Sequence, residues 1–154
     1  MKLSPHFTLE EAIASATARR MHLDNMPPPT ILPRLEFVAQ TILEPVRAQF
    51  GRPIIYDGSL SWYRSAAVNA ACGGVAHSQH VKGEAVDIEI AGISNIDIAH
   101  YVAVNVSFDQ LILENWDGVN PSSGWVHVSA VADRYQRRQI LTYSHGQITA
   151  GLPR

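Results

Sequence analysis

The sequence predicts an α+β fold in which N-terminal helices pack on a mainly antiparallel sheet. Apolar residues recur at helical spacing before residue 52, and from Pro53 onward short apolar runs are separated by Gly, Ser and Asn. Helices that come first and strands that come later are typical of α+β proteins. With 154 residues, 46% of them hydrophobic, the chain has the size of one globular domain. We therefore expect residues 1–154 to form a single domain.

Two helices are expected in the first third of the chain. Thr8 and Glu11 have the spacing of a capping box, which predicts a helix over residues 8–20. Three consecutive prolines then interrupt the helical pattern, and Thr30 is expected to cap a second helix over residues 31–50. Pro45 should kink the last turn of this helix before Gly51 ends it. Its predicted core-facing stripe consists of Leu32, Leu35, Val38, Ile42, Leu43 and Val46.

The second half of the chain reads as short strands with two short helices. Serine caps predict the helices, and runs of branched apolar residues predict the strands. Alternation within residues 83–90 directs Val86, Ile88 and Ile90 to the core and places Asp87 on the opposite face. The expected elements are a strand over 54–59, a helix over 65–71 closed by Gly73 and Gly74, a strand over 83–90, a helix over 94–104, and strands over 108–114 and 125–129.

Charge and composition exclude several classes of protein. A formal net charge of -2 argues against a nucleic-acid-binding protein, which normally carries a concentrated basic face. Only residues 134–138 (RYQRR) are locally basic, and we interpret them as a solvated strand or helix face. No apolar run is long enough for membrane insertion, and the N-terminus lacks the pattern of a signal peptide, so synthesis in the cytoplasm is expected. The single Cys72 excludes an internal disulfide.

The segment over residues 78–87 carries the most informative pattern. His80 lies on a predicted loop just before Gly83, which allows a sharp turn, and Asp87 lies within the strand that follows. Ala85 shares the strand face of Asp87 and leaves room for an ion beside it. By spacing alone, a loop histidine followed by a strand aspartate with no metal remains an alternative.

A third candidate ligand, His127, lies on the predicted strand over 125–129, where it alternates with core-facing valines. If the two strands are neighbours, His80, Asp87 and His127 converge. Two imidazoles and one carboxylate, with the fourth position left to water, form the ligand set of a catalytic zinc ion rather than of a structural one. A nearby carboxylate is then needed to move protons.

With the flanking residues included, the sequence resembles the zinc D-Ala-D-Ala carboxypeptidases, the LAS-type metallopeptidases. This family includes phage endolysins and shares its fold with the hedgehog signalling domain. Residues 78–87 match the family pattern S-x-H-x-x-G-x-A-x-D, residues 125–128 match W-[IV]-H-V, and residues 62–65 with Asn69 resemble its G-Y-R-S segment with the following Asn. The resemblance implies a hedgehog/DD-peptidase-like fold and one zinc ion held by His80, Asp87 and His127.

The resemblance also implies an activity and a setting. The expected reaction is hydrolysis of peptide bonds in peptidoglycan stem peptides or cross-links, by a D-Ala-type carboxypeptidase or an endopeptidase. The opening over residues 4–18 and the stretch over 43–47 are similar to phage-borne members. A monomer of phage or prophage origin that reaches the cell wall after release is therefore expected.

The resemblance also implies a catalytic role for Arg64. In the family, the arginine that corresponds to Arg64 contacts the substrate carboxylate or the developing oxyanion; a surface arginine in an ion pair is the alternative.

The general base is less direct to assign. Several relatives carry Glu or Asp three residues before the last histidine ligand, where this chain has Gly124. Glu114 is the preferred substitute and Asp117 the fallback, whereas alternation along strand 108–114 puts Asp109 on the other face. Glu114 could instead orient a histidine ligand.

Other polar residues near these motifs have simpler interpretations. His77 is expected to be a solvent-exposed loop histidine, Glu89 a solvated strand carboxylate, and Ser78 a brace for the loop that carries His80. Two other functions remain open. Because an acid is missing at Gly124, the chain could be a non-catalytic zinc-stabilised module that binds the cell wall, and a metal-free wall-binding protein is a third possibility.

Overall fold

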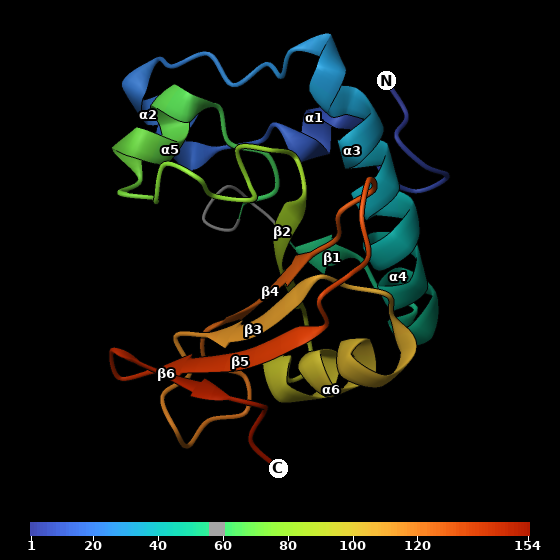
Figure 1. Ribbon diagram of the computed structural model, residues 1–154, viewed down its shortest axis with the longest axis vertical. Coiled ribbons are helices and arrows are strands. Elements are labelled where there is room, and N and C mark those ends of the chain that lie inside the picture. The colour runs from blue at the N-terminus through green and yellow to red at the C-terminus, as the bar shows by residue number, and fades with distance from the viewer. Residues whose placement is uncertain (56–60) are drawn as a thin grey trace.

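A computed structural model describes residues 1–55 and 61–154 (Figure 1). In this part of the chain, six strands form one mixed sheet of order β1-β2-β4-β3-β5-β6. Four of the five neighbouring pairs are antiparallel, and only β3 and β5 run parallel. The strands are β1 (Ile54–Ile55), β2 (Ala85–Ile90), β3 (Gln110–Glu114), β4 (Trp125–Ser129), β5 (Gln139–Ser144) and β6 (Gln147–Ala150). The predicted α+β class with a mainly antiparallel sheet is confirmed.

The helices surround this sheet on several sides. Figure 1 shows α1, α2 and α5 gathered at one end of the molecule and the segment from α3 to α4 along its side, while α6 packs against β3 and β4. The α-helices are α1 (Leu9–Ala12), α2 (Ala16–Met21), α3 (Leu32–Val38), α4 (Glu44–Phe50), α5 (Ala66–Ala71) and α6 (Asn95–Asn105). None of the helices in the described ranges has the length and apolar character needed to cross a membrane.

The first predicted helix is in fact two short helices. The capping box is present, since Thr8 Oγ1 accepts from the Glu11 amide and the Glu11 carboxylate accepts from the Thr8 amide. The prediction of one helix over 8–20 is wrong because the helix is interrupted between α1 and α2. The carbonyl of Ala12 accepts a hydrogen bond from the Tyr63 amide, and the side chain of Ser15 caps a new helix by accepting from the Ala18 amide.

The second predicted helix is nearly continuous but begins differently. It opens with a 3-10 turn (η1, Pro29–Ile31) that has no side-chain cap, so the predicted cap by Thr30 is wrong. A π-helical turn (η2, Ala39–Leu43) joins α3 to α4 immediately before Pro45, which lacks the amide that a regular helix needs there. Gly51 ends α4 with φ +62°, as predicted. Within the predicted stripe, Leu35, Val38, Ile42, Leu43 and Val46 are completely buried.

The later elements follow the predicted order with shifted ends. Ser65 and Ser94 cap α5 and α6, and the core faces of β2 and β4 are those that alternation predicts. The predicted strand over 54–59 is described only as β1, because residues 56–60 lie outside the described part. Strand β3 begins at Gln110 rather than at residue 108.

The C-terminal hairpin of β5 and β6 was not predicted. Its turn has His145 and Gly146 at φ +49° and +77°, the positive values that a tight two-residue hairpin requires. Residues 134–138, predicted as a strand or helix face, form neither. Their arginines instead bind the protein itself: Arg134 and Arg137 donate to Asp109, and the guanidinium of Arg138 lies 4.7 Å from the centre of the Phe108 ring.

Candidate metal centre

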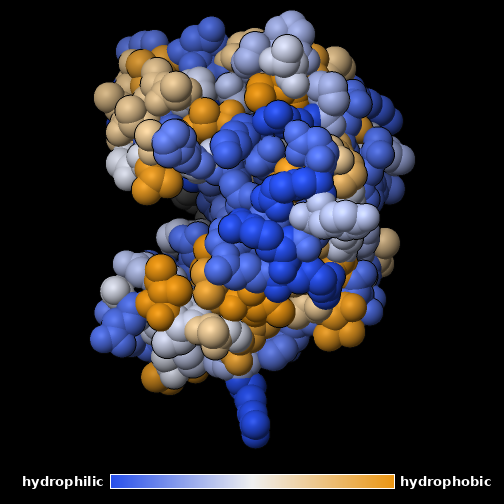
Figure 2. Space-filling model, in the orientation of Figure 1, coloured by the Kyte–Doolittle hydropathy of each residue, from blue (hydrophilic) through white to orange (hydrophobic). Residues whose placement is uncertain are grey.

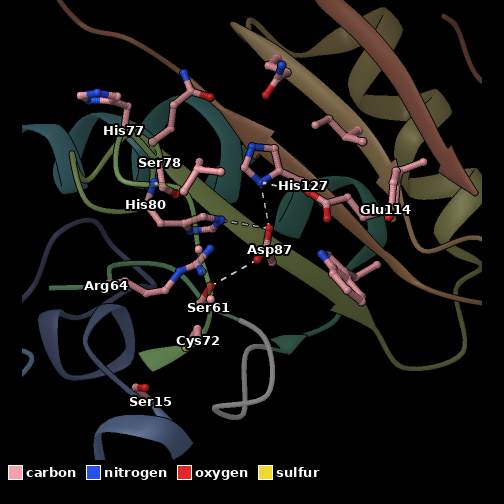
Figure 3. Close-up of a pocket in the computed structure, with 18 of the residues that line it drawn as sticks. Ser15, Ser61, Arg64, Cys72, His77, Ser78, His80, Asp87, Glu114 and His127 are labelled. Atoms are coloured by element: carbon pink, nitrogen blue, oxygen red, sulfur yellow. Dashed lines mark hydrogen bonds and ion pairs between the residues drawn. The ribbon is translucent and has the colours of Figure 1, made fainter. Parts of the chain in front are cut away.

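Three buried side chains meet where β2 and β4 lie side by side. Asp87 and His127 face each other in the antiparallel register, and the loop before β2 brings His80 alongside them. Oδ1 of Asp87 lies 2.9 Å from Nδ1 of His127 and 3.2 Å from Nε2 of His80. Figure 3 shows both imidazoles turned toward Asp87. One potential ligand atom from each residue lies within 4.8 Å of the others, so the three predicted ligands form one group.

A hydrogen bond determines which ring nitrogen of His80 is free to act as a metal ligand. Its Nδ1 lies 2.7 Å from the carbonyl oxygen of Trp62, and because a carbonyl can only accept, Nδ1 carries the proton. Nε2 is then left with its lone pair directed at Asp87. The His80 amide donates to Ser78 Oγ at 3.3 Å, which is the bracing contact expected of Ser78.

Gly83 closes the loop that carries His80. It has φ +70°, and an added Cβ would lie 2.6 Å from Cγ2 of Ile31. The glycine in this motif is therefore required both by the turn and by the close approach of the loop to the helical segment around Ile31.

Ser61 is a partner of Asp87 that sequence reasoning missed. Its hydroxyl donates to Asp87 Oδ2 at 3.2 Å, and its carbonyl accepts from the Asp87 amide at 2.7 Å. Burial alone would raise the pKa of Asp87, but its interactions with the neighbouring His80 and His127 hold that pKa well below its ordinary value. Asp87 is consequently an anion whose second oxygen is already held by Ser61, leaving Oδ1 for an ion.

This donor set fits a cation. Burial lowers the pKa of His80, which favours the neutral imidazole despite the attraction of Asp87. In that form the lone pair of Nε2 faces an anionic oxygen at 3.2 Å, an arrangement that a positive ion between them stabilises. Two imidazole nitrogens and one carboxylate oxygen, with no cysteine beside them, are the donors of catalytic zinc sites.

The triad borders a cavity of about 790 Å³. Its walls come from α2, from the loop over residues 72–79 and from strands β3, β4 and β5. Figure 2 shows the hollow at one side of the molecule, between the part that carries α2 and α5 and the part that carries β5 and β6. The three triad residues therefore lie at the wall of this cavity, among the residues that the structure describes.

Glu114 lines this cavity beside His127. Its Oε1 lies 3.8 Å from Nδ1 of His127, and the side chain is 29% exposed. Burial raises the pKa of this carboxyl group; the charge of His127 opposes the rise and the charge of Asp87 adds to it. A carboxylate with a raised pKa at the wall of such a cavity is suited to exchanging protons.

Position 124 cannot carry an acid in this backbone. Gly124 has φ +68°, and an added Cβ would collide with the carbonyl oxygen of Glu114. The amide of the Asn95 side chain donates to the Gly124 carbonyl at 2.9 Å and holds this turn in place. The departure from the family pattern at this position is therefore built into the turn between β3 and β4.

Arg64 also borders the cavity. Its amide donates to the His80 carbonyl at 3.3 Å, which ties it to the loop of that ligand. In the close-up, the side chain reaches toward Asp87 from the side of His80 and Ser61 (Figure 3). Its guanidinium forms no ion pair within residues 1–55 and 61–154, and Nε is buried without a hydrogen-bond partner there. The surface ion pair that was the alternative for Arg64 is not formed in this part of the chain.

The remaining candidates divide between cavity and scaffold. His77 lines the cavity, whereas Asp117 is exposed and accepts hydrogen bonds from the amides of its own turn. Asp109 is fully buried beneath two arginines and does not line the cavity. Glu89 accepts from the Asn95 side chain at 3.1 Å. Sequence reasoning missed Arg137 and Tyr143, which line the cavity from the unpredicted hairpin region; the His145-Gly146 turn was the signal for that hairpin.

Comparison with known proteins identifies a similar family. A family model described as Peptidase M15 matches residues 5–129. The match contains all three candidate ligands together with Arg64 and Glu114, while β5 and β6 lie beyond it. No curated protein matches the chain.

Proposed function

Because the chain belongs to the Peptidase M15 family, we propose that it is a zinc-dependent hydrolase of peptide bonds in bacterial peptidoglycan stem peptides or cross-links. The proposed type is a D-Ala carboxypeptidase or endopeptidase, encoded by a phage or prophage and acting on the cell wall as a monomer after release. The observation that carries the proposal is the buried group of His80, Asp87 and His127 at the wall of an open cavity.

In this proposal Nε2 of His80, Oδ1 of Asp87 and Nδ1 of His127 hold one zinc ion. When bound, zinc supplies a Lewis acid that polarises the scissile carbonyl and lowers the pKa of a water molecule. The protein contributes the orientation of the ligands. The Trp62 carbonyl fixes His80, and the Ser61 hydroxyl fixes Asp87.

Glu114 carries the proton in the proposed reaction. Its carboxylate accepts a proton from the attacking water as the oxygen adds to the carbonyl carbon. The same carboxyl group then donates that proton to the amide nitrogen as the C–N bond breaks, so that an amine and a carboxylic acid form, and the acid then loses its proton to the amine or to solvent. Its place beside His127 keeps it next to the reacting atoms, and its raised pKa brings its proton affinity closer to that of the groups it serves.

Arg64 is proposed to bind negative charge. Its guanidinium points into the cavity and has no acidic partner among the described residues, so it is available for a substrate carboxylate or for the developing oxyanion. Removing a single donor of this kind commonly lowers kcat by about 10²- to 10³-fold.

The test is digestion of purified muropeptides followed by mass spectrometry. We expect cleavage that disappears on chelation and returns with zinc, and that is lost in His80→Ala. His77→Ala is the matched control, because His77 lines the same cavity without belonging to the ligand group. Full activity of His80→Ala contradicts the assignment. Stoichiometric zinc without cleavage of any muropeptide supports a non-catalytic zinc-stabilised module instead.

A further inference from the structure

A fully buried carboxylate, Asp109, binds two residues that line the cavity, Gln79 and Arg137. Arg134 donates to it through Nη1 at 2.7 Å and Nη2 at 3.2 Å, and Arg137 through Nε at 2.9 Å and Nη2 at 2.7 Å. Gln79, next to the ligand His80, donates to the same group at 3.1 Å. Asp109 therefore links the loop of a proposed ligand to residues 134–137, which lie beyond the family match.

The two arginines have the same anchor but different surroundings. Both are about half exposed, with side-chain exposures of 45% for Arg134 and 50% for Arg137. Arg137 lines the cavity beside the triad and also a neighbouring hollow of about 520 Å³, whereas Arg134 lines that hollow and not the cavity. Arg134 thus provides an internal comparison for any purely structural effect of losing a partner of Asp109.

The geometry of Arg137 leaves one edge of its guanidinium available. Nε and Nη2 are bound to Asp109, while Nη1 makes no hydrogen bond to any described residue. A guanidinium that is held on one edge has lost much of its rotational freedom already, so a second carboxylate can bind to the other edge at a lower entropic cost.

Arg64 and Arg137 hold separate positions in the cavity. Arg64 is tied to the backbone of His80, because its amide donates to the His80 carbonyl at 3.3 Å. Arg137 is instead tied to Asp109, at the border between the cavity and the hollow. One cavity is therefore lined by two guanidinium groups with separate anchors, Arg64 at the backbone of His80 and Arg137 at Asp109.

We propose that Arg137 is a specificity-determining residue that binds a second carboxylate of the peptide substrate, away from the scissile bond, with Asp109 fixing its orientation. The inference rests on the proposed function and narrows the substrate class. The substrate is a peptide that carries a free carboxylate away from the bond that is cleaved. Charge-assisted hydrogen bonds of this kind are strong enough to change affinity by about 10- to 100-fold.

The experiment uses pairs of synthetic peptides that differ only in one carboxyl group, free in one member and a carboxamide in the other. The position of this carboxyl group is varied on both sides of the scissile bond, and kcat/KM is measured for each peptide with the zinc-loaded protein. We expect wild type to prefer the free carboxylate about 10-fold or more at one position. Arg137→Gln should reduce this preference to less than about 3-fold, whereas Arg134→Gln should keep it.

Several outcomes overturn the proposal. Wild type could show no preference at any position, Arg137→Gln could keep the preference, or both glutamine variants could lose it alike, which would assign the effect to Asp109 and the fold. If Arg137→Gln does not fold, Arg137→Lys retains the charge without the planar fork and should still lose most of the preference. Binding of the same peptide pairs is also measured by calorimetry, which separates a failure of the proposed function from a failure of this inference. If no peptide is hydrolysed, the proposed function is contradicted. The inference about Arg137 then still stands if wild type binds the free carboxylate more tightly and Arg137→Gln does not.

Discussion

Gly124 lies directly against the backbone carbonyl oxygen of Glu114. The position that carries an acid in several relatives is therefore adjacent to the residue proposed to replace that acid. Because Glu114 pairs with Trp125 across the sheet, the turn between them leaves no space for a side chain at position 124, while Glu114 itself points into the cavity. The proton carrier and the glycine are two parts of one local arrangement.

Restoring the family's acid should damage the protein. We expect Gly124→Glu to lower the free energy of unfolding by at least about 2 kcal/mol, since a positive φ and a collision with backbone both oppose it. Gly146→Ala is the control, because Gly146 also has a positive φ but an added Cβ there meets nothing within 4 Å. It should lose only about 1 kcal/mol in urea denaturation. A stable Gly124→Glu variant that also rescues Glu114→Gln would show that the acid belongs at 124.

Removing the carboxylate of Glu114 should stop hydrolysis without releasing zinc. We expect Glu114→Gln to lower kcat by about 10²- to 10⁴-fold, the range for loss of a general acid–base group. Zinc content, measured by elemental analysis, should stay at one ion per chain. Asp117→Asn should change kcat by less than about 3-fold, because among the described residues the Asp117 carboxylate accepts hydrogen bonds only from amides of its own turn. Loss of zinc in Glu114→Gln would instead identify Glu114 as a residue that orients His127.

The hydroxyl of Ser61 should contribute to metal affinity. It holds Oδ2 of Asp87, and removing such a partner of a ligand typically weakens metal binding by about 10- to 100-fold. We expect Ser61→Ala to show this loss in competition with a chromophoric chelator. Ser107→Ala, at an exposed serine before β3, should bind zinc as wild type does. Equal affinities for the two variants would remove Ser61 from the site.

Asp109 should make stability depend on acid pH. Burial alone would raise its pKa, but hydrogen bonds from Arg134 and Arg137 outweigh burial and hold the pKa well below the ordinary 3.8. A carboxyl whose pKa is lower in the folded state stabilises the protein above pH 3.8, and this contribution disappears as the pH falls through the folded-state pKa. We expect Asp109→Asn to cost about 2 kcal/mol at pH 7, discounted for the exposure of the arginines.

This cost should shrink steadily as denaturation is measured at lower pH, beginning below about pH 4. A difference between wild type and Asp109→Asn that is the same at pH 7 and pH 3 would show that the charge of Asp109 contributes nothing and that only its shape matters. Asp133→Asn, which changes an exposed aspartate near the same arginines, should leave stability within about 0.5 kcal/mol of wild type.

Much of the candidate site follows from local sequence pattern. Alternation along β2 and β4 correctly assigns Asp87 and His127 to the polar faces, because one side of each strand is packed on the core. What alternation cannot supply is which strands are neighbours. The register that sets Asp87 opposite His127 is a long-range pairing and becomes visible only in the folded chain.

The parts that escaped prediction depend on competition between interactions. In the sequence, Ser15 is compatible with the middle of a helix or with the start of one. The helix is interrupted there because the Ala12 carbonyl accepts a hydrogen bond from the amide of Tyr63, a residue distant in sequence. Arg134 and Arg137 look solvated in the sequence because their partner, the buried Asp109, lies 25 and 28 residues before them. The hairpin of β5 and β6 had a local signal in His145 and Gly146, but its strands contain mixed polar residues that weaken the alternation.

That hairpin also decides where the sheet ends. Without β5, the strand that carries Glu114 would be an outer strand, with unpaired backbone amides and carbonyls available to any other extended chain. Addition of β5 and β6 transfers this open edge to β6, whose four residues are all exposed. Edge-to-edge association between copies at this side of the sheet would thus begin two strands away from Glu114, at a strand that the family match does not include.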